Sequence, residues 1–221
     1  MGDRRDIAQQ PPDRATDHAR FPSARVDRRR RWFRHHRRRR SAPDQGAWFF
    51  SSSPATAPSV GSGRFDLAQP GGTCYLASTA TSAVLELVGP EFVRHGWVSG
   101  TILDARVVSS LSLPEPVRAA ALDHPQASSF RVSAELFTMS DYATTQAWAR
   151  AFSAAGFGGI LTRLRFSPGG ARGLALFGDA GVPSPPRVGD PRPVPARSLL
   201  DAMGIEIVDP PHSSAVVITD P

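Results

Sequence analysis

The order of apolar and polar residues predicts short helices and strands along the chain. The strongest helix pattern covers residues 141–155, where Asp141 is a candidate N-cap, apolar side chains share one face and Gly156 ends the helix. A second helix is predicted over residues 80–88, because a glycine and a proline follow at positions 89 and 90. Helices therefore form one part of the predicted fold.

Strand patterns lie between and after these helices. Segments rich in aromatic, β-branched or alternating apolar residues surround Trp32 and cover residues 72–77, 159–166, 173–178 and 215–218. A looser alternation between residues 92 and 113 predicts two further strands of a half-buried sheet. We therefore expect an α+β fold, formed as a single compact mixed domain around a small twisted sheet.

The positive charge of the chain is concentrated at its N-terminal end. The 221 residues carry a formal net charge of +6, and all 26 basic residues are arginines, which fits a GC-rich coding sequence. Residues 1–40 hold 14 arginines and 5 acidic residues, whereas residues 41–221 hold 12 arginines and 15 acidic residues. Because residues 1–30 are also poor in apolar side chains, we expect a disordered arginine-rich arm there and the folded domain over residues 31–221.

The sequence argues against several classes of protein. A lone Cys74 excludes an internal disulfide and a cysteine-based zinc site. No apolar run has transmembrane length and no signal peptide is recognisable, so we expect a soluble cytoplasmic protein without membrane contact. A nucleophile elbow, a dinucleotide glycine motif and a phosphate-binding loop are missing, and the histidines lack the spacing of metal ligands. We therefore expect no metal.

Three side chains, Arg64, Tyr75 and Glu86, form the most informative pattern. Arginine suits a pyrophosphate, an aromatic ring suits a flat heterocycle and a carboxylate suits a ribose, so together they predict a nicotinamide dinucleotide site. Each also has a plainer interpretation. Arg64 could form a surface ion pair with Asp66, Tyr75 could be a buried tyrosine with a satisfied hydroxyl, and Glu86 could face solvent.

The order and spacing of these residues resemble the RES domain family. The resemblance spans residues 31–180 and rests on Phe33-Arg34, Trp48-Phe49, Gly63-Arg64-Phe65-Asp66-Leu67, Gly72-Thr73-Cys74-Tyr75-Leu76-Ala77, Thr81-Ser82-Ala83-Val84-Leu85-Glu86, Tyr142-Ala143-Thr144-Thr145-Gln146-Ala147-Trp148-Ala149, Gly159-Ile160 and Leu174-Ala175-Leu176-Phe177. It implies a compact fold similar to that of ADP-ribosyltransferases. It also implies a toxin that cleaves NAD at the nicotinamide–ribose bond and is neutralised by a cognate antitoxin with an Xre-like helix-turn-helix.

The resemblance implies a role for each matching residue. Arg34 and Arg64 would hold the two phosphates of NAD, which is the substrate, and Tyr75 would stack on the nicotinamide ring. Glu86 would bond to the nicotinamide ribose and stabilise the positive charge that develops on it. Arg64, Tyr75 and Glu86 are thus the expected catalytic residues. The acceptor would be phosphate, water or a protein side chain, giving phosphorolysis, hydrolysis or ADP-ribosyl transfer.

One position departs from the family pattern. The family has a serine after a Gly-Ile strand, and here Leu164 occupies that place. Leucine forms no side-chain hydrogen bond, so the contact is lost or supplied by Thr162 or Ser167.

An alternative function is a non-catalytic RES-like protein that regulates or binds nucleic acid through its arginine-rich arm, with a salt-dependent affinity. We favour the enzyme and do not expect direct nucleic-acid binding, because residues 41–221 are mildly acidic.

Overall fold

A computed structural model of the chain describes residues 9–13, 15–38, 46–54, 62–184, 187–190 and 192–210. Its main sheet has eight strands in the order β1-β8-β9-β10-β5-β2-β7-β11. Neighbouring strands are antiparallel except β8 and β9, which are parallel. In that order the strands are β1 (Ser23–Val26), β8 (Val117–Ala121), β9 (Gly159–Arg163), β10 (Arg172–Asp179), β5 (Gly71–Ala77), β2 (Arg31–Arg37), β7 (Arg106–Ser112) and β11 (Val194–Pro195).

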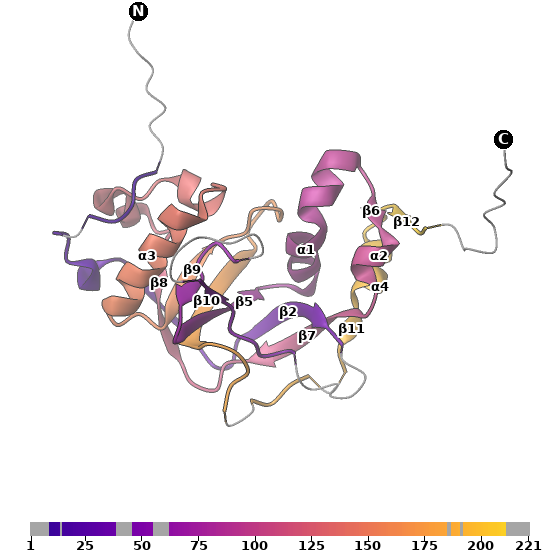
Figure 1. Ribbon diagram of the computed structural model, residues 1–221, viewed down its shortest axis with the longest axis horizontal. Coiled ribbons are helices and arrows are strands. Elements are labelled where there is room, and N and C mark those ends of the chain that lie inside the picture. The colour runs from indigo at the N-terminus through magenta and orange to yellow at the C-terminus, as the bar shows by residue number, and fades with distance from the viewer. Residues whose placement is uncertain are drawn as a thin grey trace, which may run out of the picture.

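Two helices cover different parts of one face of this sheet (Figure 1). Helix α3 packs on the β8–β10 half and helix α1 on the β2–β7 half. The remaining short elements surround this arrangement. The helices are α1 (Ala80–His95), α2 (Gly100–Leu103), α3 (Tyr142–Ala154), α4 (Ala196–Ala202) and the 3-10 helices His18–Arg20, Pro125–Phe130 and Ala134–Phe137, and the short strands are β3 (Ser52–Ser53), β4 (Leu67–Ala68), β6 (Val98–Ser99) and β12 (Ile207–Val208).

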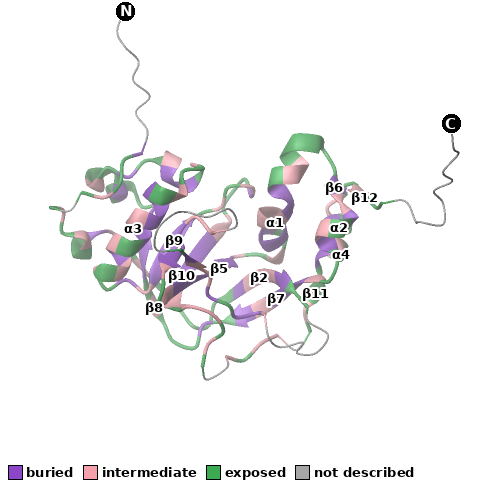
Figure 2. Cartoon of the chain, in the orientation of Figure 1, coloured by how far each residue is buried: buried purple, intermediate pink, exposed green. Residues whose placement is uncertain are grey.

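The core follows the alternation of side chains along the strands. On β5, Cys74 and Leu76 enter a cluster on the face opposite the two helices, together with Trp48. Tyr75 and Ala77 point to the helical face, where they meet the α3 and α1 clusters respectively. Figure 2 shows the central strands largely buried and the outer end of α1 exposed. The sheet is therefore covered on both faces. The fold confirms the predicted single compact α+β domain, but its main sheet, with eight strands, is larger than the small sheet expected.

The prediction of a disordered arm over residues 1–30 is wrong for most of that segment. Strand β1 pairs with β8 at the edge of the sheet, and Phe21, which is 2% exposed, enters the core beside α3. Gln9 is also buried, and its side-chain oxygen accepts from the Ser133 backbone N–H at 2.8 Å. A few apolar side chains suffice here because the sheet edge supplies hydrogen-bond partners. Residues 1–8 lie outside the described residues.

Helix α1 is longer than predicted. It starts at the Thr79 cap, whose side chain accepts from the Ser82 backbone N–H, and runs on to a left-handed Gly96. A Cβ at Gly89 would lie 2.2 Å from the Phe166 ring, so this glycine permits close packing instead of ending the helix. The second half of α1 packs in one apolar cluster with α4, and this packing outweighs the tendency of Pro90 to end a helix.

Other predicted elements can be compared with the structure in the same way. The predicted helix 141–155 is confirmed, with Asp141 accepting from Ala143 N at 3.0 Å. The region 92–113 forms one long strand, β7, and the short elements β6 and α2, because α1 takes its first residues. Strand β9 ends at Arg163, and the predicted strand 215–218 lies outside the described residues.

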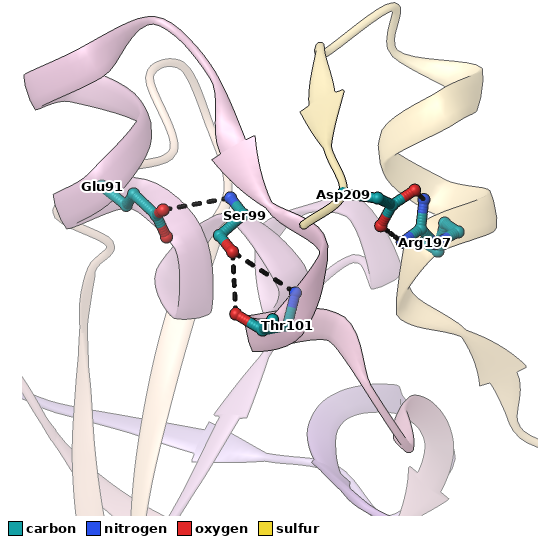
Figure 3. Close-up of polar contacts among 5 residues, drawn as sticks. All are labelled: Glu91, Ser99, Thr101, Arg197 and Asp209. Atoms are coloured by element: carbon teal, nitrogen blue, oxygen red, sulfur yellow. Dashed lines mark hydrogen bonds and ion pairs between the residues drawn. The ribbon is translucent and has the colours of Figure 1, made fainter. Parts of the chain in front are cut away.

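Polar contacts tie the outer end of α1 to β6, and α4 to the segment after β12 (Figure 3). Glu91 accepts from the Ser99 backbone N–H at 3.0 Å, and Arg197 pairs with Asp209 at 2.5 Å. The Arg197–Asp209 pair is largely exposed and contributes little to stability. The C-terminal elements are held to the rest of the domain mainly by the parallel pairing of β6 with β12 and by the apolar cluster that α4 shares with α1. Within the described segments, no helix has the length and apolarity needed to cross a membrane.

Candidate active site

The three residues singled out by the sequence pattern line one cavity of about 690 Å³. Arg64 reaches it from the loop before β4, Tyr75 from β5 and Glu86 from α1. The cavity lies on the helical face of the sheet, above the place where β2 meets β5 through the pair Phe33 and Ala77. The structure therefore brings the three side chains together.

A buried carboxylate, Asp66, shapes the loop that carries Arg64. It is 0% exposed and accepts hydrogen bonds from the Gly63 backbone N–H at 2.6 Å and from the Ser51 and Tyr75 hydroxyls at 2.8 Å each. A Cβ at Gly63 would lie 2.4 Å from the Tyr75 hydroxyl oxygen, so only glycine fits there. The Gly-Arg-Phe-Asp sequence is thus a compact turn organised by its own aspartate.

Tyr75 has a fixed hydroxyl and a ring that lines the cavity. The hydroxyl donates to Asp66 and accepts from the Phe65 backbone N–H, each at 2.8 Å. Burial raises the pKa of Tyr75 well above its ordinary value, and the charge of Asp66 and the hydrogen bond to it act in the same direction. The phenol therefore stays protonated, and its ring lines the cavity without charge. The plainer interpretation of Tyr75 is correct for its hydroxyl, which is buried and hydrogen-bonded, but the ring also lines the cavity.

Arg64 is held at both its backbone and its side chain. Its carbonyl accepts from the Thr145 hydroxyl on α3, and its guanidinium donates to the Phe137 carbonyl. Burial lowers the pKa of Arg64, whereas Tyr142 and Glu86 raise it. An arginine remains charged at neutral pH after such a shift. The alternative of a surface pair between Arg64 and Asp66 is wrong, because Asp66 is buried and bonded elsewhere.

Glu86 is half-buried in the middle of α1. Its Oε1 accepts from the Phe166 backbone N–H at 2.7 Å. Burial raises the pKa of Glu86, while the backbone N–H groups of Phe166 and Arg165 and the charge of Arg64 lower it. The carboxylate therefore faces the cavity with one oxygen anchored, and the interpretation of Glu86 as an ordinary solvent-facing helix residue is wrong.

Arg34 differs from the other three candidates. It lines the cavity, but its guanidinium donates to the carbonyls of Gly46 and Ala47, the second at 3.2 Å. Ala47 belongs to the cluster on the opposite face, which also holds Trp32, two residues before Arg34 on β2. The guanidinium is thus not gathered with Arg64, and its phosphate-binding role stays a prediction that this geometry does not favour.

Leu164 occupies the expected serine position and lines the cavity. It packs over Gly173, where an added Cβ would lie 2.6 Å from the leucine Cδ2. Thr162 also lines the cavity, and its hydroxyl donates to the Arg163 carbonyl at 3.2 Å. Ser167 is 6% exposed and is not part of the cavity wall. Of the two proposed substitutes, Thr162 is therefore the better placed.

Several residues of the cavity wall were not among the site residues predicted from the sequence. They are His35, Arg94, Tyr142, Arg163 and Arg165. The alternation around Phe33 could have identified His35, because residues two apart on a strand share a face. Arginine outnumbers carboxylate in this wall, where Glu86 is the carboxylate, so the cavity favours an anionic ligand. Among the described residues, His, Cys, Asp and Glu do not cluster in a way that would hold a metal ion.

Comparisons with known proteins agree with this architecture. A chain in the crystal structure of the M. tuberculosis MbcT–MbcA toxin–antitoxin complex superimposes with a TM-score of 0.50 at 13% sequence identity, over 77% of this chain and 87% of that chain. At this identity the similarity concerns the fold. A search of curated proteins found no match. The family model of the RES domain matches residues 11–197, which is most of the chain, and this protein therefore belongs to the RES domain family.

Proposed function

We propose that this protein is a RES toxin that binds NAD in the cavity and cleaves the bond between nicotinamide and ribose. The observation that carries the proposal is the meeting of Arg64, Tyr75 and Glu86 on one cavity wall. A cation, an aromatic platform and a carboxylate are the groups that a pyrophosphate, a nicotinamide ring and a ribose require. Membership of the RES family supports the same substrate.

The state of Arg64 supports an anionic ligand. Its Nε is buried and has no hydrogen-bond partner among the described residues. A buried N–H without a partner costs about 1–3 kcal/mol, which a phosphate oxygen would offset. Arg163 and Arg165 line the same cavity and are exposed, so they add positive charge at its mouth.

The proposed reaction has two parts, the departure of nicotinamide and the attack of an acceptor on the ribose. When the C–N bond breaks, its electron pair leaves with nicotinamide and positive charge develops on the ribose. The anchored Glu86 carboxylate is placed to stabilise that charge and to bond to a ribose hydroxyl. An oxygen of the acceptor then bonds to the same carbon and releases a proton. Water would give ADP-ribose, phosphate would give its 1-phosphate, and a protein side chain would give an ADP-ribosylated product.

We also propose a cognate antitoxin of the Xre-like class, because uncontrolled loss of NAD would harm the producing cell. The MbcT–MbcA complex supports an antitoxin partner by analogy of fold. The alternative, a non-catalytic regulator that binds nucleic acid through a free arm, has less support. Within the supposed arm, Ser23–Val26 pair with β8 at the sheet edge and Phe21 enters the core.

The test is a time course of nicotinamide release from NAD by the purified protein, with and without phosphate. Glu86→Gln keeps an acceptor for the Phe166 N–H and removes the negative charge, so we expect it to fold and to lose at least about 100-fold in rate. Glu115→Gln, at an exposed carboxylate outside the cavity, is the matched control and should retain full activity. Equal rates for wild type and Glu86→Gln would refute the role of the carboxylate. Expression of the same variants in cells tests toxicity.

A further inference from the structure

His35 faces the cavity and has no part in the chemistry described above. It follows Phe33 by two residues on β2, so both side chains point to the helical face while Arg34 points away. The Nδ1 of His35 lies 2.9 Å from the backbone carbonyl oxygen of Ala83, in the first half of α1. A carbonyl oxygen can only accept, so this contact places a ring proton on Nδ1.

The surroundings of His35 keep the ring neutral. Burial lowers the pKa of His35 to about 4, and the neighbouring cations Arg34 and Arg106 and the adjacent His36 act in the same direction. The hydrogen bond to Ala83 opposes them in part. At neutral pH the other ring nitrogen, Nε2, is therefore an unprotonated hydrogen-bond acceptor, and it forms no hydrogen bond to the described residues.

Acceptors are scarce among the charged and polar side chains of this cavity. Its arginines can only donate hydrogen bonds and its hydroxyls, such as those of Tyr142 and Thr162, can donate or accept, so Glu86 and the Nε2 of His35 are the lining side-chain groups that only accept. NAD has two kinds of donor near its reacting bond, the ribose hydroxyls and the carboxamide N–H of nicotinamide. Glu86 is suited to the ribose, as argued above.

The position of His35 favours the carboxamide. Strands β2 and β5 are antiparallel and meet at Phe33 and Ala77, so His35, two residues after Phe33, and Tyr75, two residues before Ala77, lie in the same direction from this pair on their separate strands, and both line the cavity. A nicotinamide ring lying on Tyr75 would therefore present its edge toward β2.

We propose that the Nε2 of His35 accepts a hydrogen bond from the carboxamide N–H of nicotinamide, so that the cavity selects NAD over its nicotinic acid analogue. This inference rests on the proposed function, because it requires the dinucleotide in this cavity. The analogue carries a carboxylate, which has no proton to donate and would place a negative charge against a nitrogen lone pair. A site built to bond one such group discriminates by about tenfold or more.

The experiment compares NAD with nicotinic acid adenine dinucleotide, by calorimetric Kd and by kcat/KM for release of the base. Wild type should prefer NAD by about tenfold or more, and His35→Phe, which keeps a ring but has no acceptor, should reduce the preference to about twofold. His35→Gln can donate to Ala83 and accept from the ligand, so it should retain part of the preference. His95→Phe, at an exposed histidine that stacks on Trp97 outside the cavity, is the control.

The outcomes separate this inference from the proposed function. If wild type neither binds nor cleaves NAD, the proposed function fails and the inference fails with it. If wild type binds or cleaves NAD but folded His35→Phe keeps the full preference, the inference alone is overturned. An equal loss of affinity and of kcat/KM for both dinucleotides in His35→Phe also overturns the inference. That result would mean that His35 contacts a group that the two ligands share, such as a ribose hydroxyl.

Discussion

Asp66 does not line the cavity, but replacing it should lower both the free energy of unfolding and the activity. Its two carboxylate oxygens receive three donors, the Gly63 N–H on Oδ2 and the hydroxyls of Tyr75 and Ser51 on Oδ1. In Asp66→Asn the side-chain oxygen can keep the two hydroxyls, but the NH₂ group then faces the Gly63 N–H. One buried N–H loses its acceptor, which costs about 1–3 kcal/mol in the free energy of unfolding.

Asp66→Ala should cost more. The Ser51 hydroxyl already lies 3.1 Å from the Thr73 carbonyl and can bond there alone. The Gly63 N–H and the Tyr75 hydroxyl both lose their acceptor, so two groups at about 1–3 kcal/mol each give a loss of about 2–6 kcal/mol. The freed Tyr75 ring and Arg64 loop should also lower kcat/KM for NAD in both variants.

Urea denaturation followed by circular dichroism measures the free energies of unfolding, and nicotinamide release measures the activity. Asp179→Asn, at an exposed carboxylate at the end of β10, is the control and should behave as wild type. If Asp66→Asn unfolds within about 0.5 kcal/mol of wild type and keeps its activity, then Asp66 does not hold the site together and the reasoning is refuted.

Two further predictions concern β2 and its neighbours. Arg34→Ala should lower the free energy of unfolding by about 1–3 kcal/mol, because its guanidinium serves the Gly46 and Ala47 carbonyls, and should leave KM for NAD within about twofold. Arg64→Ala should instead raise KM, and steady-state kinetics showing the reverse order would restore Arg34 as the phosphate ligand. His35 has a pKa of about 4 when folded against 6.5 when unfolded, so the unfolded chain binds the extra proton between these values. Stability should therefore fall as pH drops from 6.5 to 4, by at most about 3 kcal/mol and by less where solvent reaches the ring, and His35→Phe should remove this part of the pH dependence in urea titrations.

The sequence predicted the elements that carry local signals of their own. Asp141 and Gly156 bracket α3 as predicted, and the opposite directions of Cys74 and Tyr75 follow from strand alternation. Helix α1 likewise begins at Ala80, the first residue of the predicted helix 80–88. These features depend on a few neighbouring residues, and tertiary contacts did not oppose them.

The remaining errors have tertiary causes. Gly89 resembles a helix end in the sequence, but it is a contact point for the Phe166 ring, which lies far along the chain. Residues 15–30 are polar by composition, yet β8 provides a strand for β1 and the α3 cluster provides a pocket for Phe21. The alternative of a surface pair between Arg64 and Asp66 fails because the donors that bury Asp66, the hydroxyls of Ser51 and Tyr75, become its neighbours only after folding.

Alternation along β2 decides to which face of the sheet each of its side chains points. Arg34 has the chemistry expected of a phosphate ligand, but Trp32 enters the core on the face away from the helices, and a residue two positions later must point the same way. Phe33 pairs with Ala77 on the face that carries Tyr75, so the His35 side chain points to the helical face while the Arg34 side chain points to the opposite one. A shift of one residue in the pairing of β2 would exchange the two side chains. The seven-residue pairing with β7 opposes such a shift, so on β2 it is the neutral imidazole of His35, and not the guanidinium of Arg34, that shares the helical face with Tyr75.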